Sequence, residues 1–211
     1  MHTASLSIND FLDRLASDDP TPGGGALAAL AGAQAGAMLA MVCQLTVGRP
    51  RFAAVEDQVR GLLDQLAGCR RELLALADAD ADVYGEVAAA YRLPRGTDAE
   101  KATRTAAIQA ALVGATEVPL QTMEAAARVL RLAVQTAEAG NPTLLPDVSV
   151  GVHIALAGLR GAQEQARYNV ASLTDAARAS TFDRRMRAAA DQAEANAERA
   201  LHVVSERLNR T

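Results

Sequence analysis

The sequence predicts an all-α protein, built as a bundle of long antiparallel helices. Half of its 211 residues are hydrophobic, but only 3% are aromatic and there is no tryptophan. Its apolar residues are mainly alanine, leucine and valine, which form a core by close approach of helix backbones. Long segments repeat apolar residues at helical spacing, and none alternates with the period of two that is typical of a strand. We expect one helical domain over residues 1–211.

Signals for helix starts and stops divide the chain into segments. Ser7 with Asp10 resembles a capping box at the start of the first helix. Thr97 with Glu100 forms a second one. Because Pro119 suits the first turn of a helix, we expect one helix to end near residue 117 and another to begin beside it. In order, the expected helices span residues 8–16, 26–47, 53–91 (as one helix or two), 97–117, 119–140, 147–171 and 174–210.

The segment 26–47 carries no charge and is long enough to cross a bilayer. It consists mostly of alanine and glycine and contains Gln34 and Gln44, so its drive for membrane insertion is small. We therefore interpret it as a fully buried helix of the bundle, and we expect no membrane partner.

Charge and the content of cysteine and histidine argue against several classes of function. The 21 basic and 25 acidic residues give a net charge of −4, which provides no basic field for nucleic acid. Cys43 and Cys69 have no metal-ligand or redox spacing, and the three histidines are too scattered for a zinc cluster. We expect no nucleic-acid partner, no metal, and reduced core cysteines in a cytoplasmic protein without a signal peptide.

A glycine run, Gly23, Gly24 and Gly25, stands directly before the uncharged segment. Backbone N–H groups at the start of a helix can bind an anion there. The alternative is a tight turn between helices, where glycine permits positive φ. The run matches neither a P-loop nor the G-x-G-x-x-G pattern, so it does not predict a nucleotide site.

Three acids, Asp78, Asp80 and Asp82, alternate along a predicted helix. Asp78 and Asp82 share one face, whereas Asp80 points about 200° away from Asp78. The run does not fit a calcium-binding loop. A solvated acidic face is one interpretation, and the other is an inward carboxylate with a raised pKa that acts as a general acid or base.

Other polar residues lie at predicted helix ends. Thr46 lies at the end of the uncharged segment and Arg49 and Arg51 follow it. Either arginine can pair with a carboxylate ligand or be an ordinary basic helix end. Asp147, near a predicted helix start, is adequately explained as a helix cap. Asn169, within an apolar helix, is adequately explained as a buried amide whose hydrogen bonds are satisfied.

Together these stretches resemble the cyclodeaminase/cyclohydrolase family, which comprises the C-terminal domain of formiminotransferase-cyclodeaminase and stand-alone bacterial methenyltetrahydrofolate cyclohydrolases. The resemblance covers almost the whole chain. It rests on the order and spacing of these landmarks: Pro22 to Gly25, Thr46 to Gly48, Asp78 to Ala81 with Tyr84, Leu93 and Pro94, Glu100 and Lys101, Arg104 and Thr105, Ala107, Gln109, Val118 to Leu120, Gly140 and Asn141, Asp147, Gly161 and Ala162, and Asn169.

The resemblance implies an all-helical homodimer that takes a tetrahydrofolate derivative as substrate and has no tightly bound cofactor. It implies that the second acid of the run, Asp80, is the catalytic residue. It also implies substrate-binding roles for Gly23, Gly24, Gly25, Thr46, Arg49, Asp147 and Asn169, with the glycine run and Arg49 at the anionic glutamate tail. The chain departs from the family pattern at Pro146 and Gln165, where the family usually has serine and asparagine.

Two folate reactions remain open at this point. The first is hydrolysis of 5,10-methenyltetrahydrofolate to formyltetrahydrofolate, and the second is cyclisation of 5-formiminotetrahydrofolate with release of ammonia. A single aspartate can serve either, as a base toward water or as an acid toward the leaving nitrogen. The alternatives of another class are a non-catalytic folate-binding or scaffold bundle and a membrane-associated bundle.

Overall fold

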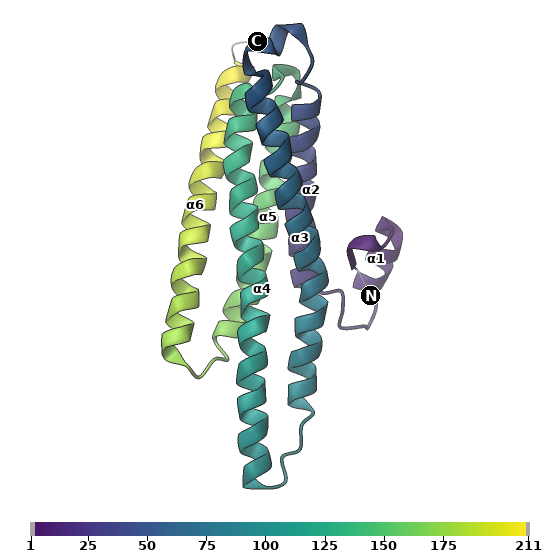
Figure 1. Ribbon diagram of the computed structural model, residues 1–211, viewed down its shortest axis with the longest axis vertical. Coiled ribbons are helices and arrows are strands. Elements are labelled where there is room, and N and C mark those ends of the chain that lie inside the picture. The colour runs from purple at the N-terminus through teal and green to yellow at the C-terminus, as the bar shows by residue number, and fades with distance from the viewer. Residues whose placement is uncertain (1–2, 210–211) are drawn as a thin grey trace.

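Five long helices form an elongated bundle, with one short helix beside it (Figure 1). The computed structural model describes residues 3–209, and in that range it contains no strand. The predicted all-α fold class is confirmed. The helices are α1 (Ile8–Leu15), α2 (Gly24–Gln44), α3 (Glu56–Tyr91), α4 (Asp98–Ala139), α5 (Leu145–Val170) and α6 (Ala176–Leu208).

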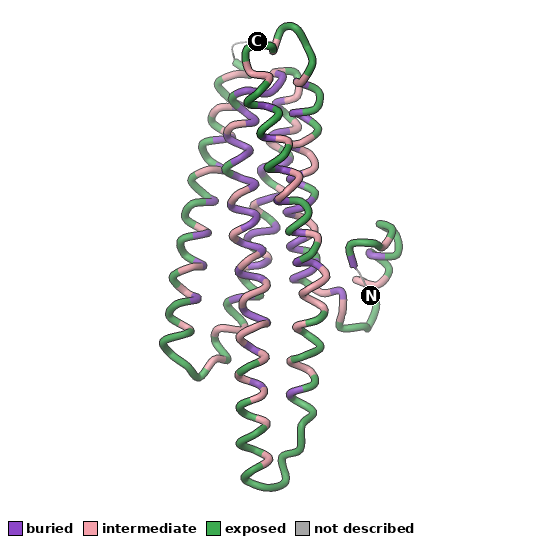
Figure 2. The backbone as a smooth tube through the Cα atoms, viewed as in Figure 1, coloured by how far each residue is buried: buried purple, intermediate pink, exposed green. Residues whose placement is uncertain are grey.

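Helix α4 lies at the centre of the bundle and contacts α2, α3, α5 and α6. Buried residues follow the inner faces of the helices, while the hairpin of α3 and α4 extends beyond the others and is exposed at its tip (Figure 2). Alanine and glycine let backbones approach closely: a Cβ atom at Gly158 of α5 would lie 2.7 Å from the Ala28 carbonyl oxygen of α2. The aromatic-poor composition thus produces tight helix packing.

Both predicted N-terminal caps are present. The Ser7 side chain accepts a hydrogen bond from the Asp10 N–H, and Thr97 and Glu100 form a complete capping box at the start of α4. The segment predicted as one helix or two is a single helix, α3. Cys43 and Cys69 are buried free thiols, as expected.

The predicted break between helices at residues 117–119 is wrong. Helix α4 continues through Pro119, which is buried. Proline lacks the N–H that would donate to the carbonyl of Ala115, four residues earlier. The side chain of Asn169 on α5 replaces that donor, with Nδ2 2.6 Å from the Ala115 oxygen. Because the freed carbonyl has a partner, the helix continues past the proline.

Helix α2 is only partly buried, which corrects the prediction of a fully buried helix. One face packs against α3, α4 and α5, but Leu27, Gln34 and Met41 are exposed on the other side. These three residues, spaced by seven, define the α2 outer face. By length and composition, Gly24–Gln44 and Pro142–Val170 could each cross a membrane, although 56% and 39% of their most apolar parts are buried inside the bundle.

Candidate active site

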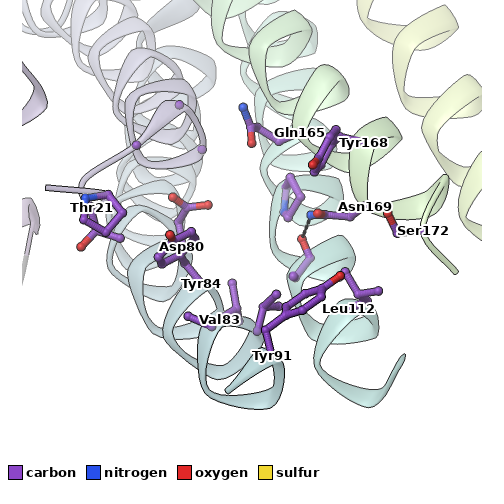
Figure 3. Close-up of a pocket in the computed structure, with 18 of the residues that line it drawn as sticks. Thr21, Asp80, Val83, Tyr84, Tyr91, Leu112, Gln165, Tyr168, Asn169 and Ser172 are labelled. Atoms are coloured by element: carbon purple, nitrogen blue, oxygen red, sulfur yellow. Dashed lines mark hydrogen bonds between the residues drawn. The ribbon is translucent and has the colours of Figure 1, made fainter. Parts of the chain in front are cut away.

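A cavity of about 660 Å³ opens where the start of α2 meets α3, α4 and the end of α5 (Figure 3). We call it the Asp80 cavity. Its walls combine small, aromatic and polar side chains, a mixture that suits a ligand with rings and polar edges. It is lined by Pro20, Thr21, Gly23, Gly24, Gly25, Asp80, Val83, Tyr84, Val87, Ala88, Tyr91, Arg92, Leu112, Ala115, Pro119, Gln165, Tyr168, Asn169 and Ser172.

The Asp80 carboxylate lies against the glycine-rich start of α2. The Ala26 N–H donates to Asp80 Oδ2 at 3.0 Å. Gly23, the N-cap residue, has no side chain that could accept a hydrogen bond from an N–H of the first turn of α2. The Asp80 carboxylate, which belongs to α3, accepts such a bond instead. A Cβ atom at Gly25 would lie 2.0 Å from Asp80 Oδ1, so the close approach requires glycine at this position. The glycine run therefore positions Asp80.

Burial raises the pKa of Asp80, and the hydrogen bond from Ala26 partly opposes this rise. Within residues 3–209, Oδ1 has no hydrogen-bond partner. One oxygen is thus anchored on the protein, while the other remains available to a ligand or a water molecule in the cavity. A carboxyl group whose charged form is disfavoured is suited to exchange a proton during a reaction.

Asp80 has a different environment from Asp78 and Asp82, as the helical spacing of the three acids predicts. Asp78 Oδ1 accepts a hydrogen bond from the Ala4 N–H at 3.0 Å and so holds the N-terminal segment against α3. Asp82 is exposed. Of the three, Asp80 alone lines the cavity.

All three tyrosines of this aromatic-poor chain line the Asp80 cavity. Tyr84 and Tyr91 come from α3 and Tyr168 comes from α5 (Figure 3). Tyr91 was not among the site residues predicted from the sequence. The signal was present, because Asp80, Tyr84 and Tyr91 follow one helix face at positions i, i+4 and i+11.

The predicted substrate-binding residues fall into two groups. Gly23, Gly24, Gly25 and Asn169 line the cavity with Asp80. Thr46 and Arg49 lie past the far end of α2, about 30 Å away by the rise of 1.5 Å per residue, and Asp147 lies in the first turn of α5, about 33 Å along that helix from Asn169. Within a single chain, Thr46, Arg49 and Asp147 therefore do not share a pocket with Asp80.

Thr46 and Arg49 form hydrogen bonds away from the Asp80 cavity. Thr46 Oγ1 donates to the Val42 carbonyl at 2.7 Å and accepts from the Asn141 N–H at 2.9 Å. Arg49 Nε donates to the Leu45 carbonyl at 2.8 Å. The bond between Thr46 and Asn141 joins the end of α2 to the turn between α4 and α5, and Arg49 caps the end of α2 itself.

Arg92 is the one cationic residue among those that line the cavity in the described chain. It follows the last residue of α3, twelve positions after Asp80, which corresponds to about 18 Å along the helix. The Asp80 carboxylate and the Arg92 guanidinium are therefore at different ends of the cavity. Within residues 3–209, no three histidine, cysteine or acidic side chains are grouped as a metal site requires.

Comparison with known proteins identifies relatives that match most of this chain. The sequence profile of the formiminotransferase-cyclodeaminase family matches residues 7–200. A methenyltetrahydrofolate cyclohydrolase from Methylorubrum extorquens is 39% identical over 203 residues, which cover 96% of this chain and 98% of that protein. The formimidoyltransferase-cyclodeaminase of Rattus norvegicus is 31% identical over 169 residues, which are 80% of this chain but 31% of the rat protein.

The fold has a solved counterpart. The crystal structure of a formiminotetrahydrofolate cyclodeaminase from Thermotoga maritima matches this structure with a TM-score of 0.80 and 26% sequence identity, covering 97% of this chain and 96% of that one. The landmarks of the sequence, the helical architecture and the match over residues 7–200 all agree. The chain therefore belongs to the formiminotransferase-cyclodeaminase family.

Proposed function

We propose that the chain is a folate one-carbon enzyme and that the Asp80 cavity is its active site. The observation that carries this proposal is a half-buried carboxylate with a raised pKa, held at a glycine-lined helix start inside a cavity. The Methylorubrum relative, matched along 98% of its length, is named a cyclohydrolase. Hydrolysis of 5,10-methenyltetrahydrofolate is therefore the first candidate reaction.

In this reaction, Asp80 acts as a general base. Water attacks the cationic methenyl carbon, forming a C–O bond, and Asp80 Oδ1 accepts the proton that the water loses. The negative charge of the carboxylate also stabilises the cationic substrate. The C–N bond then breaks as the new hydroxyl loses its remaining proton to solvent and becomes the formyl C=O. The leaving nitrogen takes up the proton held by Asp80, which gives formyltetrahydrofolate and one released proton.

Cyclisation of 5-formiminotetrahydrofolate is the second candidate, supported by the structural match to a cyclodeaminase. Here N10 attacks the formimino carbon to form a C–N bond, and the N10 proton passes to the formimino nitrogen. The bond from the carbon to that nitrogen then breaks, which releases ammonia and gives the 5,10-methenyl cation. Asp80 in its protonated form donates to the departing nitrogen. The raised pKa favours this form more than an ordinary aspartate would.

The rest of the cavity fits the remaining parts of a folate, which we propose as substrate and not as resident cofactor. The three tyrosines offer aromatic surfaces to its rings. Arg92, at the other end from Asp80, offers a positive charge to the glutamate carboxylates. Asp80, which acts on the one-carbon unit, and Arg92, which binds the glutamate carboxylates, are thus separated along α3.

The direction of the pH profile distinguishes the two reactions. If Asp80 is the base for hydrolysis, kcat/KM rises as pH rises through the folded-state pKa of Asp80. If it is the acid for cyclisation, kcat/KM falls over the same interval. In both cases the midpoint lies above the usual aspartate range, because burial raises this pKa.

Initial rates of both conversions, measured spectrophotometrically on one preparation from about pH 4 to 9, test this proposal. We expect at least one conversion to be catalysed and to show the slope assigned to it. A folded protein that catalyses neither conversion and binds no folate by calorimetry would contradict the enzyme proposal and favour a scaffold bundle.

We also propose that the chain forms a homodimer through the α2 outer face. This face is uncharged, and the adjacent helix α5 exposes Val150 and Ala157. A two-fold contact would cover the same apolar strip on both copies. With the two α2 helices antiparallel, Thr46 and Arg49 of one copy would lie near the glycine-rich helix start of the other. The second copy could then supply the distant group of predicted residues.

Met41→Glu, at one end of the α2 outer face, is expected to separate the dimer, because it brings a charge from each copy into an apolar contact. Light scattering after size exclusion should give twice 22.0 kDa for the wild type and 22.0 kDa for the variant. Leu208→Glu, at an exposed leucine of α6, is the matched control and should remain dimeric. A monomeric wild type would contradict the homodimer, and a dimeric Met41→Glu would contradict this face.

A further inference from the structure

Pro119 and Asn169 form an unusual link between α4 and α5 at the wall of the Asp80 cavity. In a regular helix, the Ala115 carbonyl would accept from the N–H of residue 119, which proline lacks. Asn169 Nδ2 donates to this carbonyl at 2.6 Å instead. Figure 3 shows the Asn169 side chain reaching from α5 to α4 to make this bond. The proline thus creates an acceptor that the asparagine uses.

This bond fixes the orientation of the Asn169 amide. A carbonyl oxygen can only accept, so the NH₂ group must face Ala115 and Oδ1 must point elsewhere. Within the described chain, Oδ1 has no protein partner, and Asn169 lines the cavity. With an N–H at residue 119, the Ala115 carbonyl would have its helical bond and the amide could turn either way. The amide therefore presents an acceptor to the ligand because residue 119 is proline.

We propose that Pro119 is a positioning residue for substrate binding: it frees the Ala115 carbonyl, which holds the Asn169 amide so that Oδ1 accepts a hydrogen bond from an N–H group of the substrate's ring. The identity of the substrate rests on the proposed function, because a reduced pterin ring carries such N–H donors. The link between Pro119 and Asn169 rests only on the geometry of α4 and α5.

A thermal-unfolding cycle tests the link without using activity. Asn169→Ala leaves the Ala115 carbonyl without its donor and is expected to lower Tm by about 2–6 °C. In a Pro119→Ala background, the new backbone N–H satisfies that carbonyl, so the same substitution should lower Tm by less than half as much. Pro119→Val repeats the cycle with a larger side chain. An equal loss of Tm in all three backgrounds would overturn the link.

Kinetics test the role toward the substrate. Asn169→Asp cannot donate to Ala115 and is expected to raise KM about 10-fold, and Pro119→Ala and Pro119→Val should raise it about 3-fold. Because Asp80 is unchanged, kcat should remain within about 2-fold of the wild type. A packing defect alone would lower Tm without this separation of KM from kcat. Wild-type KM in both Pro119 variants would overturn the positioning role.

Different results would contradict the proposed folate activity and the positioning role of Pro119. If the wild type neither converts nor binds a folate, the proposed function fails, and the unfolding cycle still decides whether Pro119 and Asn169 are coupled. If the wild type is active but its KM does not respond at residue 119, the positioning role fails and the proposed function stands.

Discussion

Asp80→Asn is expected to lower kcat by about 10²- to 10⁴-fold for whichever folate conversion the wild type catalyses. The amide has nearly the same shape as the carboxylate, and its oxygen can still accept from the Ala26 N–H, which now lies 3.0 Å from Asp80 Oδ2. It cannot take up a proton from water or donate one to a leaving nitrogen as a carboxyl group does. Single-turnover rates with saturating enzyme measure the loss directly.

Thermal unfolding shows whether this loss is chemical. Because burial raises the pKa of Asp80, its stabilising contribution is complete below the unfolded-state pKa and is lost as pH rises through the folded-state pKa. At neutral pH the Asp80→Asn variant, with its uncharged amide, should therefore unfold at the same temperature as the wild type or at a higher one. Asp82→Asn, at the exposed neighbouring acid, is the matched control and should keep wild-type kcat. Equal kcat in Asp80→Asn and the wild type would remove Asp80 from the mechanism.

Gly25→Ala is expected to lower kcat about 100-fold, the size of effect that a displacement of about 1 Å can cause. The added Cβ atom would lie 2.0 Å from Asp80 Oδ1 and 2.6 Å from Cγ, distances that force the carboxylate away from the start of α2. The hydrogen bond from Ala26 should be lost with it. Steady-state kinetics measure the effect, and a crystal structure of the variant shows where the carboxylate has moved.

Gly61→Ala provides the control for a glycine substitution in a helix. Gly61 lies on α3, and a Cβ atom there meets nothing within 4 Å. This variant should keep wild-type activity and gain up to about 1 kcal/mol in the free energy of unfolding. If Gly25→Ala were as active as Gly61→Ala, the close approach of Gly25 to Asp80 would have no catalytic role.

Local signals were sufficient to predict much of the fold and the position of Asp80. The capping residues Ser7 and Thr97 begin the helices that the sequence predicts. Helical rotation alone separated Asp80 from Asp78 and Asp82, and the structure places these acids in different environments. Such features depend on residues within one or two turns of each other, which the sequence displays directly.

Contacts between distant segments were not predictable in this way. Proline usually begins a helix, and α4 continues through Pro119 because Asn169, fifty residues later, supplies the missing donor. The separation of Arg49 from Asp80 has a different cause. A helix that starts at Gly24 and ends at Gln44 must place its two ends about 30 Å apart. The length of α2 was therefore enough to predict that Arg49 lies far from Asp80 in one chain.

The crystal structure of Asp80→Asn with bound 5,10-methenyltetrahydrofolate is the most direct test that the Asp80 cavity is a folate active site, since the substitution should allow binding while it slows turnover. We predict that the bridging one-carbon unit lies within hydrogen-bonding distance, directly or through one water molecule, of residue 80 at the start of α2. A folate bound outside the cavity, or bound within it with the one-carbon unit away from residue 80, would contradict the account.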